Sequence, residues 1–146
     1  MPDPIAPLQG LHHVRVTVTD IERSKAFYAM VFGRDPRIDT SDQVADPGAT
    51  EDPARFFGGC IFDLDGQLFG LRPSAAAGTR FDPTRVGLDH VSFGVATKAE
   101  LAAAAQRLDE AGVTHGGVTS LGDAGISILS FQDPDDINLE LVAPEA

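Results

Sequence analysis

The stretch Gly87-Leu88-Asp89-His90-Val91 decides the fold, because its pattern also occurs in the first half of the chain as Gly10-Leu11-His12-His13-Val14. Both copies read Gly-Leu-x-His-Val, and alternating apolar residues follow each of them. Self-similarity at half the length of a 146-residue chain indicates two structural units rather than a short-period solenoid. Each unit is therefore predicted to place one histidine, His13 or His90, near the start of a strand.

The composition is that of an ordinary globular protein of one domain's size. Hydrophobic residues make up 42% and charged residues 23% of the chain, which differs from the composition of a disordered tail. A net charge of −11 repels phosphate backbones, so we expect no nucleic-acid partner. Residues 1–4 do not resemble a signal peptide, and no apolar stretch approaches bilayer length. We therefore expect a cytoplasmic protein with no membrane partner, in which Cys60 is a buried hydrophobic residue rather than a catalytic thiol.

Residues 10–73 are predicted to form the first unit. Apolar and polar residues alternate from Leu11 to Thr19, which predicts a strand with His13 and Arg15 on one face. Asp20 fits an N-cap, and Gly33 fits the C-terminal stop of the helix that follows. The remaining expectations are a candidate strand at 37–39, a polar loop at 41–53, and strands at about 54–64 and 67–72 joined by Asp65-Gly66.

Residues 86–143 repeat this plan after a linker at about 74–85 that is rich in Gly, Ala and Pro. A strand is predicted over 86–96, and Thr97 with Glu100 forms a capping box for an alanine-rich helix that ends at Gly112. Further strands are expected at about 113–120, 124–132 and 137–142, with a turn at 133–136. The chain is therefore predicted to be α+β, one domain over residues 1–146 built from two βαβββ modules.

Three side chains are candidate metal ligands: His13, His90 and Glu140. Matching repeat positions favour convergence of the two histidines over the alternative that each only forms a local hydrogen bond. Glu140 lies between two leucines in a strand expected to be mostly buried, where a carboxylate needs a partner or a metal. A solvated edge position, or a pair with Arg15, is the alternative for Glu140. Two imidazoles and one carboxylate are a ligand set for Zn, Fe, Mn, Co or Ni ions, and they leave coordination positions open for a small-molecule substrate.

Arg15 and Ser92 are candidate catalytic residues, because each lies two residues beyond a histidine on the same strand face. Arg15 is suited to pair with an anionic substrate group, or alternatively with Glu140 or a loop carboxylate. The closing hairpins of the two units also correspond, which sets Gly70 at the position of Glu140. The other polar residues near the histidines are given no role in the site: His12 and His115 are expected at the surface, and Asp89 is expected to be structural and to face away from His90.

Together these residues resemble the vicinal-oxygen-chelate superfamily, which includes glyoxalase I, fosfomycin-resistance transferases, extradiol dioxygenases and bleomycin-resistance proteins. The resemblance covers residues 10–143 and is specific for the superfamily rather than for one reaction. It lies in LHHVRVTVTD at 11–20, in residues 24–33 with Ala26-Phe27-Tyr28, in GLDHVSF at 87–93 and in FQDPDDINLEL at 131–141.

The resemblance implies two βαβββ modules whose curved mixed sheets form a cup around a divalent metal. In that pattern the first strand of each module supplies one ligand, here His13 and His90, and the last strand can supply another, here Glu140. Gly70 at the fourth position has no side chain for ligation, which departs from glyoxalase I. The remaining His-His-Glu set resembles that of extradiol dioxygenases and fosfomycin-modifying enzymes. Asp136 also departs from the family, which usually has glycine in this Asp-Pro-Asp-Gly turn.

The function implied by the resemblance is a metal-dependent lyase, transferase or extradiol-type dioxygenase that chelates vicinal oxygens of a small substrate. The alternative is a metal-free small-molecule-binding protein of the bleomycin-resistance kind. Exchanged dimers are common among proteins similar to this one, so a homodimer is expected. The site then lies within one chain, or it joins His13 of one chain to His90 and Glu140 of another. The loops at 34–53 and 73–85, which would select the substrate, carry no recognisable motif.

Overall fold

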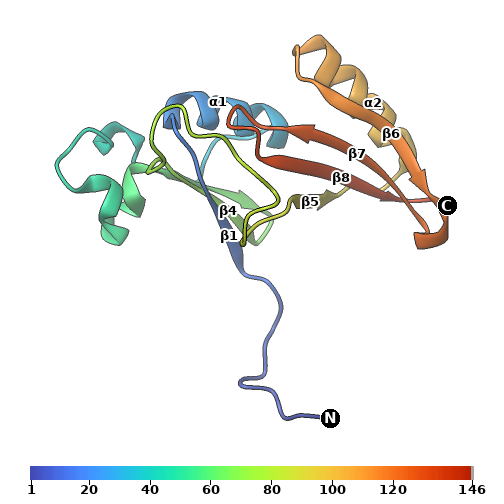
Figure 1. Ribbon diagram of the computed structural model, residues 1–146, viewed down its shortest axis with the longest axis horizontal. Helices are drawn as coiled ribbons and strands as arrows, with labels where there is room; N and C mark the ends of the chain where they lie inside the picture. The colour runs from blue at the N-terminus through green and yellow to red at the C-terminus, as the bar shows by residue number, and fades with distance from the viewer. Residues whose placement is uncertain (146) are drawn as a thin grey trace. The chain divides into compact units, whose positions relative to one another are not determined.

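The computed structural model describes residues 1–145. The chain divides into two compact units, Met1–Ala77 and Gly78–Ala146. Each unit has one four-stranded mixed sheet and one α-helix of three turns or more (Figure 1). The predicted α+β class, with two βαβββ modules, is confirmed.

The first unit has a sheet in the order β1-β4-β3-β2. Strand β1 is parallel to β4, whereas β3 is antiparallel to both of its neighbours, so the sheet is mixed. The positive φ angle of Asp65, 58°, and that of Gly66, 106°, form the tight turn that the Asp-Gly pair predicts. The elements are β1 (His13–Thr17), α1 (Ile21–Phe32), β2 (Ile38–Asp39), β3 (Cys60–Leu64) and β4 (Gln67–Arg72).

Helix α1 begins and ends at the residues that the sequence predicts. The Asp20 carboxylate accepts a hydrogen bond from the Arg23 backbone N–H at 3.1 Å, and Gly33 closes the helix in the left-handed region with φ 65°. The buried face of α1 carries Tyr28, whose ring centroid lies 4.9 Å from that of Phe69 on β4. Burial of these aromatic rings fixes α1 on one face of the sheet and leaves the other face for His13 and Arg15.

Residues 41–58 correct the prediction of a polar loop followed by a strand from residue 54. They form three short 3₁₀ segments, Ser41–Gln43, Ala49–Glu51 and Pro53–Gly58, and β3 begins only at Cys60. Asp52 starts the third segment by accepting a hydrogen bond from the Ala54 N–H at 2.9 Å. Phe56 and Phe57 then adopt left-handed backbone angles, with φ 48° and 60°, which are incompatible with an extended strand.

The second unit repeats the topology, with the sheet order β5-β8-β7-β6. Strand β5 is parallel to β8, and β6, β7 and β8 are antiparallel neighbours. Strand β5 is shorter than the predicted strand over 86–96, because Gly87 has a φ of 142° and the chain bends before Val91. The elements are β5 (Val91–Gly94), α2 (Lys98–Glu110), β6 (His115–Leu121), β7 (Ile126–Gln132) and β8 (Asn138–Pro144).

Helix α2 has the predicted capping box. The Thr97 hydroxyl accepts from the Glu100 N–H at 3.3 Å, and the Glu100 carboxylate accepts from the Thr97 N–H at 3.0 Å. Leu101 and Leu108 of this helix are buried. The helix packs against the second sheet (Figure 1). Within residues 1–145, no helix is both long enough and apolar enough to cross a membrane.

The turn between β7 and β8 explains why Asp136 is tolerated in place of glycine. The Asp133 carboxylate accepts hydrogen bonds from the Asp135 N–H at 2.8 Å and the Ile137 N–H at 2.9 Å. This side chain closes the turn, and Asp136 takes a left-handed φ of 67° that aspartate adopts more readily than most residues. Asp136 also accepts from Arg80 Nε at 2.6 Å, an interaction that glycine lacks.

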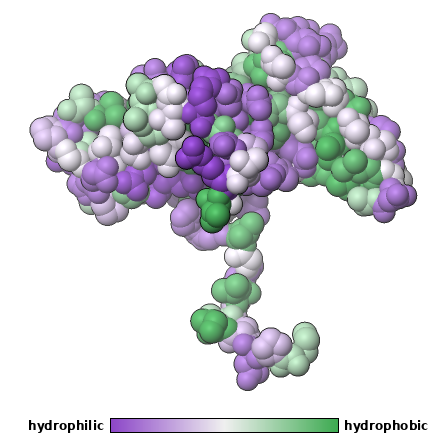
Figure 2. Space-filling model, in the orientation of Figure 1, coloured by the Kyte–Doolittle hydropathy of each residue, from purple (hydrophilic) through white to green (hydrophobic). Residues whose placement is uncertain are grey.

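The N-terminal arm, residues 1–11, is exposed throughout. Relative to a reference exposed residue, its hydrophobic residues Ile5, Leu8 and Leu11 are 106%, 86% and 90% exposed. Figure 2 shows hydrophobic residues along the arm. These side chains therefore add nothing to the hydrophobic core, which lies between each sheet and its helix.

Candidate metal site

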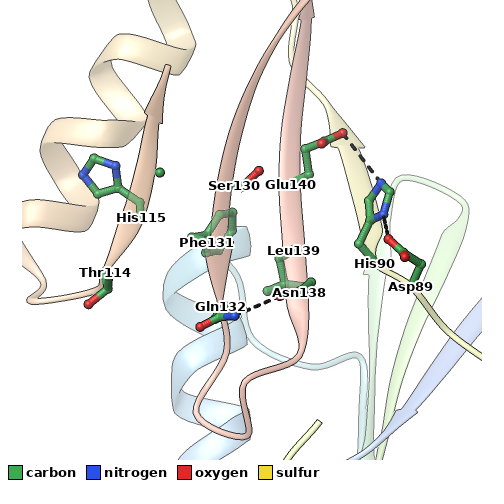
Figure 3. Close-up of a pocket in the computed structure, with 11 residues that line it drawn as sticks. Asp89, His90, Thr114, His115, Ser130, Phe131, Gln132, Asn138, Leu139 and Glu140 are labelled. Atoms are coloured by element: carbon green, nitrogen blue, oxygen red, sulfur yellow. Dashed lines mark hydrogen bonds and ion pairs between the residues drawn. The ribbon is translucent and has the colours of Figure 1, made fainter. Parts of the chain in front are cut away.

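His90 and Glu140 lie together on one face of the second sheet (Figure 3). Glu140 is on β8, and its neighbour Leu139 is buried on the opposite face, where α2 packs. His90 immediately precedes β5, the strand parallel to β8. The distance from His90 Nε2 to Glu140 Oε1 is 3.9 Å. This imidazole nitrogen and this carboxylate oxygen are two of the three predicted metal ligands, and they lie close together.

Asp89 fixes the orientation of the His90 ring, which corrects the expectation that Asp89 faces away. Its Oδ1 lies 2.6 Å from His90 Nδ1 (Figure 3). Because a carboxylate accepts, Nδ1 carries the proton in the neutral ring, and the lone pair is on Nε2, the nitrogen that faces Glu140. Metal-ligating histidines in proteins typically donate their second ring N–H in this way.

Glu140 is a mostly buried carboxylate, and few neighbouring groups stabilise its negative charge. Its side chain is 18% exposed, and its Oε1 accepts one hydrogen bond, from the Ser92 hydroxyl at 2.8 Å. No lysine or arginine of the described second unit, residues 78–145, lies within ion-pair distance of it. A carboxylate in such a position is stabilised by a bound cation. Ser92, predicted as catalytic, is placed here as the residue that orients Glu140.

A hollow of about 480 Å³ opens beside His90 and Glu140. Most of the residues that line it are polar, and the Gln132 side-chain amide donates a hydrogen bond to the Asn138 side-chain oxygen Oδ1 at 2.9 Å (Figure 3). The volume is in the range of small-molecule sites. The second unit therefore combines two potential metal ligands with space for a small substrate.

His115 also borders this hollow, but its ring is fully engaged. Its Nε2 lies 2.9 Å from Asp109 Oδ1 on α2, and its Nδ1 accepts from the Gly117 N–H at 3.0 Å. The side chain is only 14% exposed, so the expectation of a surface residue is wrong. With both nitrogens bonded, His115 joins β6 to α2 rather than offering a ligand.

In the first unit, His12 contacts the Nδ1 atom of His13, as Asp89 contacts the Nδ1 atom of His90 in the second unit. The Nδ1 atoms of His12 and His13 are 2.9 Å apart, so one of them donates and the other accepts. When His13 is the donor, its Nε2 lone pair is free for a metal. In both units, therefore, the residue before the candidate ligand bonds to its Nδ1.

The strand registers confirm that Gly70 occupies the position of Glu140. Arg15 on β1 is paired with Gly70 on β4, and Ser92 on β5 is paired with Glu140 on β8. The Arg15 side chain lies over Gly70: a Cβ atom added to Gly70 would be 3.1 Å from Arg15 Nε. A guanidinium thus takes the place in the first unit that a carboxylate has in the second.

Neither unit by itself, over residues 1–145, groups three His, Cys, Asp or Glu side chains so that they are positioned to bind one metal. The second unit offers His90 and Glu140, and the first offers His13. The three-ligand set remains a prediction, and it requires donors from both units, of one chain or of two.

Cys60 is buried on β3, as predicted. Burial raises the pKa of its thiol to about 12, so the nucleophilic thiolate is absent near neutral pH. A catalytic role for Cys60 is therefore not supported.

The fold and the arrangement of these side chains define a class of proteins. The chain belongs to the Glyoxalase/Bleomycin resistance protein/Dioxygenase superfamily, whose family model matches residues 10–141.

Individual relatives extend this likeness over nearly the whole chain. Over 134 residues, the chain is 28% identical to the uncharacterized protein YwkD of Bacillus subtilis (strain 168), covering 92% of this chain and 96% of YwkD. The structure is similar to a glyoxylase/bleomycin resistance protein/dioxygenase domain from Frankia sp. EAN1pec, with TM-score 0.72, 26% identity and coverage of 94% and 93%. It also shares its fold with a variant of the fosfomycin resistance protein FosX from Listeria monocytogenes complexed with Mn(II) and 1S,2S-dihydroxypropylphosphonic acid, with TM-score 0.68, 17% identity and coverage of 94% and 93%.

Proposed function

We propose that this protein is a metal-dependent enzyme that binds a divalent cation through His13, His90 and Glu140 and acts on a small molecule with two neighbouring oxygen atoms. The observation that carries the proposal is the approach of His90 Nε2 to Glu140 Oε1, 3.9 Å apart, with His90 Nδ1 bonded to Asp89. Two imidazoles and one carboxylate suit Zn, Fe, Mn, Co or Ni ions. The Mn(II) complex of FosX, a protein with the same fold, supports a divalent metal.

The donor set leaves coordination positions for a substrate, which is the arrangement of catalytic rather than structural sites. When bound, the cation would supply Lewis acidity to oxygen atoms that reach it. The chain's own residues prepare the site: Asp89 orients His90, and Ser92 orients Glu140. The hollow beside them is lined by amide and hydroxyl groups suited to bonding a polar substrate.

We also propose that the protein is a homodimer. Each unit alone offers an incomplete ligand set, and a second copy is one way to complete it. Light scattering of the purified protein is expected to give twice the monomer mass. A monomer at assay concentration would refute the dimer and leave a site within one chain.

Metal affinity of the EDTA-treated protein, measured by competition with a chromophoric chelator, tests the proposed function. We expect about one metal ion per site, and we expect His13→Ala, His90→Ala and Glu140→Gln each to weaken binding by more than about a hundredfold, because ligand loss exceeds the effect of losing an outer-shell partner. His115→Asn is the matched control and should retain the affinity. A wild-type protein that binds no divalent metal at neutral pH would contradict the proposal. If small-molecule binding then survived in chelator, the metal-free bleomycin-resistance type would take its place.

A further inference from the structure

Arg15 occupies the face of the first sheet that carries His13. The two residues alternate with Val14 on β1, so their Cα atoms are about 7 Å apart on the same face. The Arg15 side chain lies over Gly70, where an added Cβ would be 3.1 Å from Nε and 3.4 Å from Cγ. Glycine leaves this space open, and a larger residue at position 70 would require the Arg15 side chain to shift by a few tenths of an ångström. The position that lacks a fourth ligand is therefore the position over which the Arg15 side chain lies.

Phe57 also contacts the Arg15 guanidinium. Its ring centroid lies 5.0 Å from Arg15 Cζ and 4.0 Å from Arg72 Cζ, so one ring contacts two cations. Phe57 and Phe56 adopt φ angles of 60° and 48°, and such left-handed angles cost non-glycine residues about 1–2 kcal/mol each. Backbone strain of this kind is found at ligand-binding positions, where the surrounding structure stabilises it.

The turn that carries Phe57 is held by backbone hydrogen bonds and packs closely against the sheet. The Phe57 N–H donates to the Asp52 carbonyl at 3.0 Å, and the Gly59 N–H donates to the Phe56 carbonyl at 3.0 Å. Gly59 also approaches β4 so closely that a Cβ atom would clash with the Leu71 carbonyl oxygen. The turn is therefore a fixed support for Arg15 rather than a loose loop.

Within residues 1–77, Arg15 has no carboxylate partner, unlike its neighbour Arg72. Arg72 donates to Glu51 at 2.9 Å, whereas no carboxylate of the described first unit pairs with Arg15. An arginine without a carboxylate partner is unexpected in this chain, because acidic residues, 22 in number, outnumber the 11 lysines and arginines. Other arginines in ion pairs are Arg34, Arg37, Arg55, Arg80 and Arg85.

We propose that Arg15, which lies over Gly70 and contacts Phe57, is a binding site for an oxyanion of the substrate, a carboxylate or a phosphonate. A guanidinium offers two parallel N–H donors that match the paired oxygens of either group. The proposal rests on the proposed function in one respect: it names the substrate class of the same site as a small acid. Because Arg15 and His13 are near each other on one strand face, the acid group and the atoms that reach His13 belong to one small molecule.

NMR of the metal-free protein with nitrogen-labelled arginine tests the proposal without any enzymatic assay. Acetate and methylphosphonate are titrated separately at constant ionic strength, so that either source of the oxyanion is detected. We expect a saturable shift of the Arg15 Nε–H signal with at least one of them. Arg15→Gln lacks this signal, so its anion affinity is measured beside that of the wild type by calorimetric titration, and it should be about ten- to a hundredfold weaker, as expected for the loss of charge-assisted hydrogen bonds.

Gly70→Ala provides a second variant that retains the charge. Its Cβ requires the Arg15 side chain to shift by a few tenths of an ångström, so the affinity should fall by less than about tenfold but measurably, because a hydrogen bond is distorted rather than removed. Arg37→Gln, which removes an arginine paired with Asp63, is the matched control and should leave binding unchanged.

The proposal is overturned if neither anion gives a saturable shift at Arg15, or if Arg37 and Arg15 shift alike. Metal affinity of the same samples separates this result from the proposed function. Metal binding without anion binding refutes the oxyanion site alone. Anion binding without metal binding supports the oxyanion site and refutes the metalloenzyme.

Discussion

Asp89→Ala is expected to weaken divalent metal binding about tenfold to a hundredfold without unfolding the protein, because Asp89 anchors a proposed ligand from outside the ligand set. The structure gives the magnitude. Asp89 Oδ1 lies 2.6 Å from His90 Nδ1, and the Asp89 and His90 side chains are 77% and 44% exposed. Hydrogen bonds to charged groups contribute about 1.5–3 kcal/mol, and this exposure favours the lower end. Since about 1.4 kcal/mol is tenfold in affinity, a loss near tenfold is the central expectation.

The assay is metal competition with EDTA-treated protein, carried out on Asp89→Ala and Asp89→Asn. Asparagine still has a carbonyl oxygen that accepts from Nδ1–H, so its affinity should lie between that of Asp89→Ala and wild type. The matched control is Asp109→Asn, which alters the Asp109–His115 pair, at 2.9 Å in the same unit. Urea unfolding of each variant should show that Asp89→Ala leaves the free energy of unfolding unchanged, because Asp89 is exposed. Wild-type affinity in Asp89→Ala, or an equal loss in Asp109→Asn, would refute the reasoning.

Three further predictions concern stability and reactivity. Cys60 should resist a disulfide reagent at about pH 8 in the folded protein and react in urea, since burial raises its pKa to about 12; rapid labelling of the folded state would contradict this. Gly33→Ala should lower the free energy of unfolding by about 1 kcal/mol, because φ is 65° at this helix end, and an unchanged urea midpoint would count against it. Hydrogen bonds from Ser127, Lys98 and Ser120 lower the pKa of Glu145 below 4.5. Glu145→Gln should therefore be less stable than wild type at neutral pH, and the difference should vanish as the pH falls through the lowered pKa; a difference independent of pH would be the contrary result.

Helix ends and the repeat were predictable because their signals are local. Asp20 and Gly33 around α1, and Thr97 with Glu100 at α2, satisfy backbone groups within a few residues of themselves. Such bonds depend little on the rest of the fold. The same holds for the paired Gly-Leu-x-His-Val segments, which begin equivalent strands in both units.

Residues 41–58 were not predictable from periodicity, because their conformation depends on contacts distant in sequence. The left-handed angles of Phe56 and Phe57 occur in a turn packed against β4, and the Phe57 ring contacts both Arg15 and Arg72. Nothing in the local sequence indicates such angles, since phenylalanine is typical of strands.

The contact of Asp89 with His90 was not predicted, because the alternation of side chains between the two faces of a strand was applied to residues that precede β5. Neighbouring residues of a strand face opposite sides, but β5 begins only at Val91, so Asp89 and His90 precede the strand and this rule does not apply to them. The available signal was the polar residue before each histidine, His12 and Asp89.

Pairing of Gly70 with Arg15 and of Glu140 with Ser92 was accessible from the repeat, because strand register follows the hydrophobic pattern.

The central claim is that His13 and His90 bind the same metal ion through Nε2, and cadmium NMR of protein with nitrogen-labelled histidines tests it most directly. The account predicts one cadmium signal coupled to Nε2 of both histidines, with Nδ1 of each still protonated. Coupling to His90 without His13, coupling through Nδ1, or coupling to His115 would contradict it.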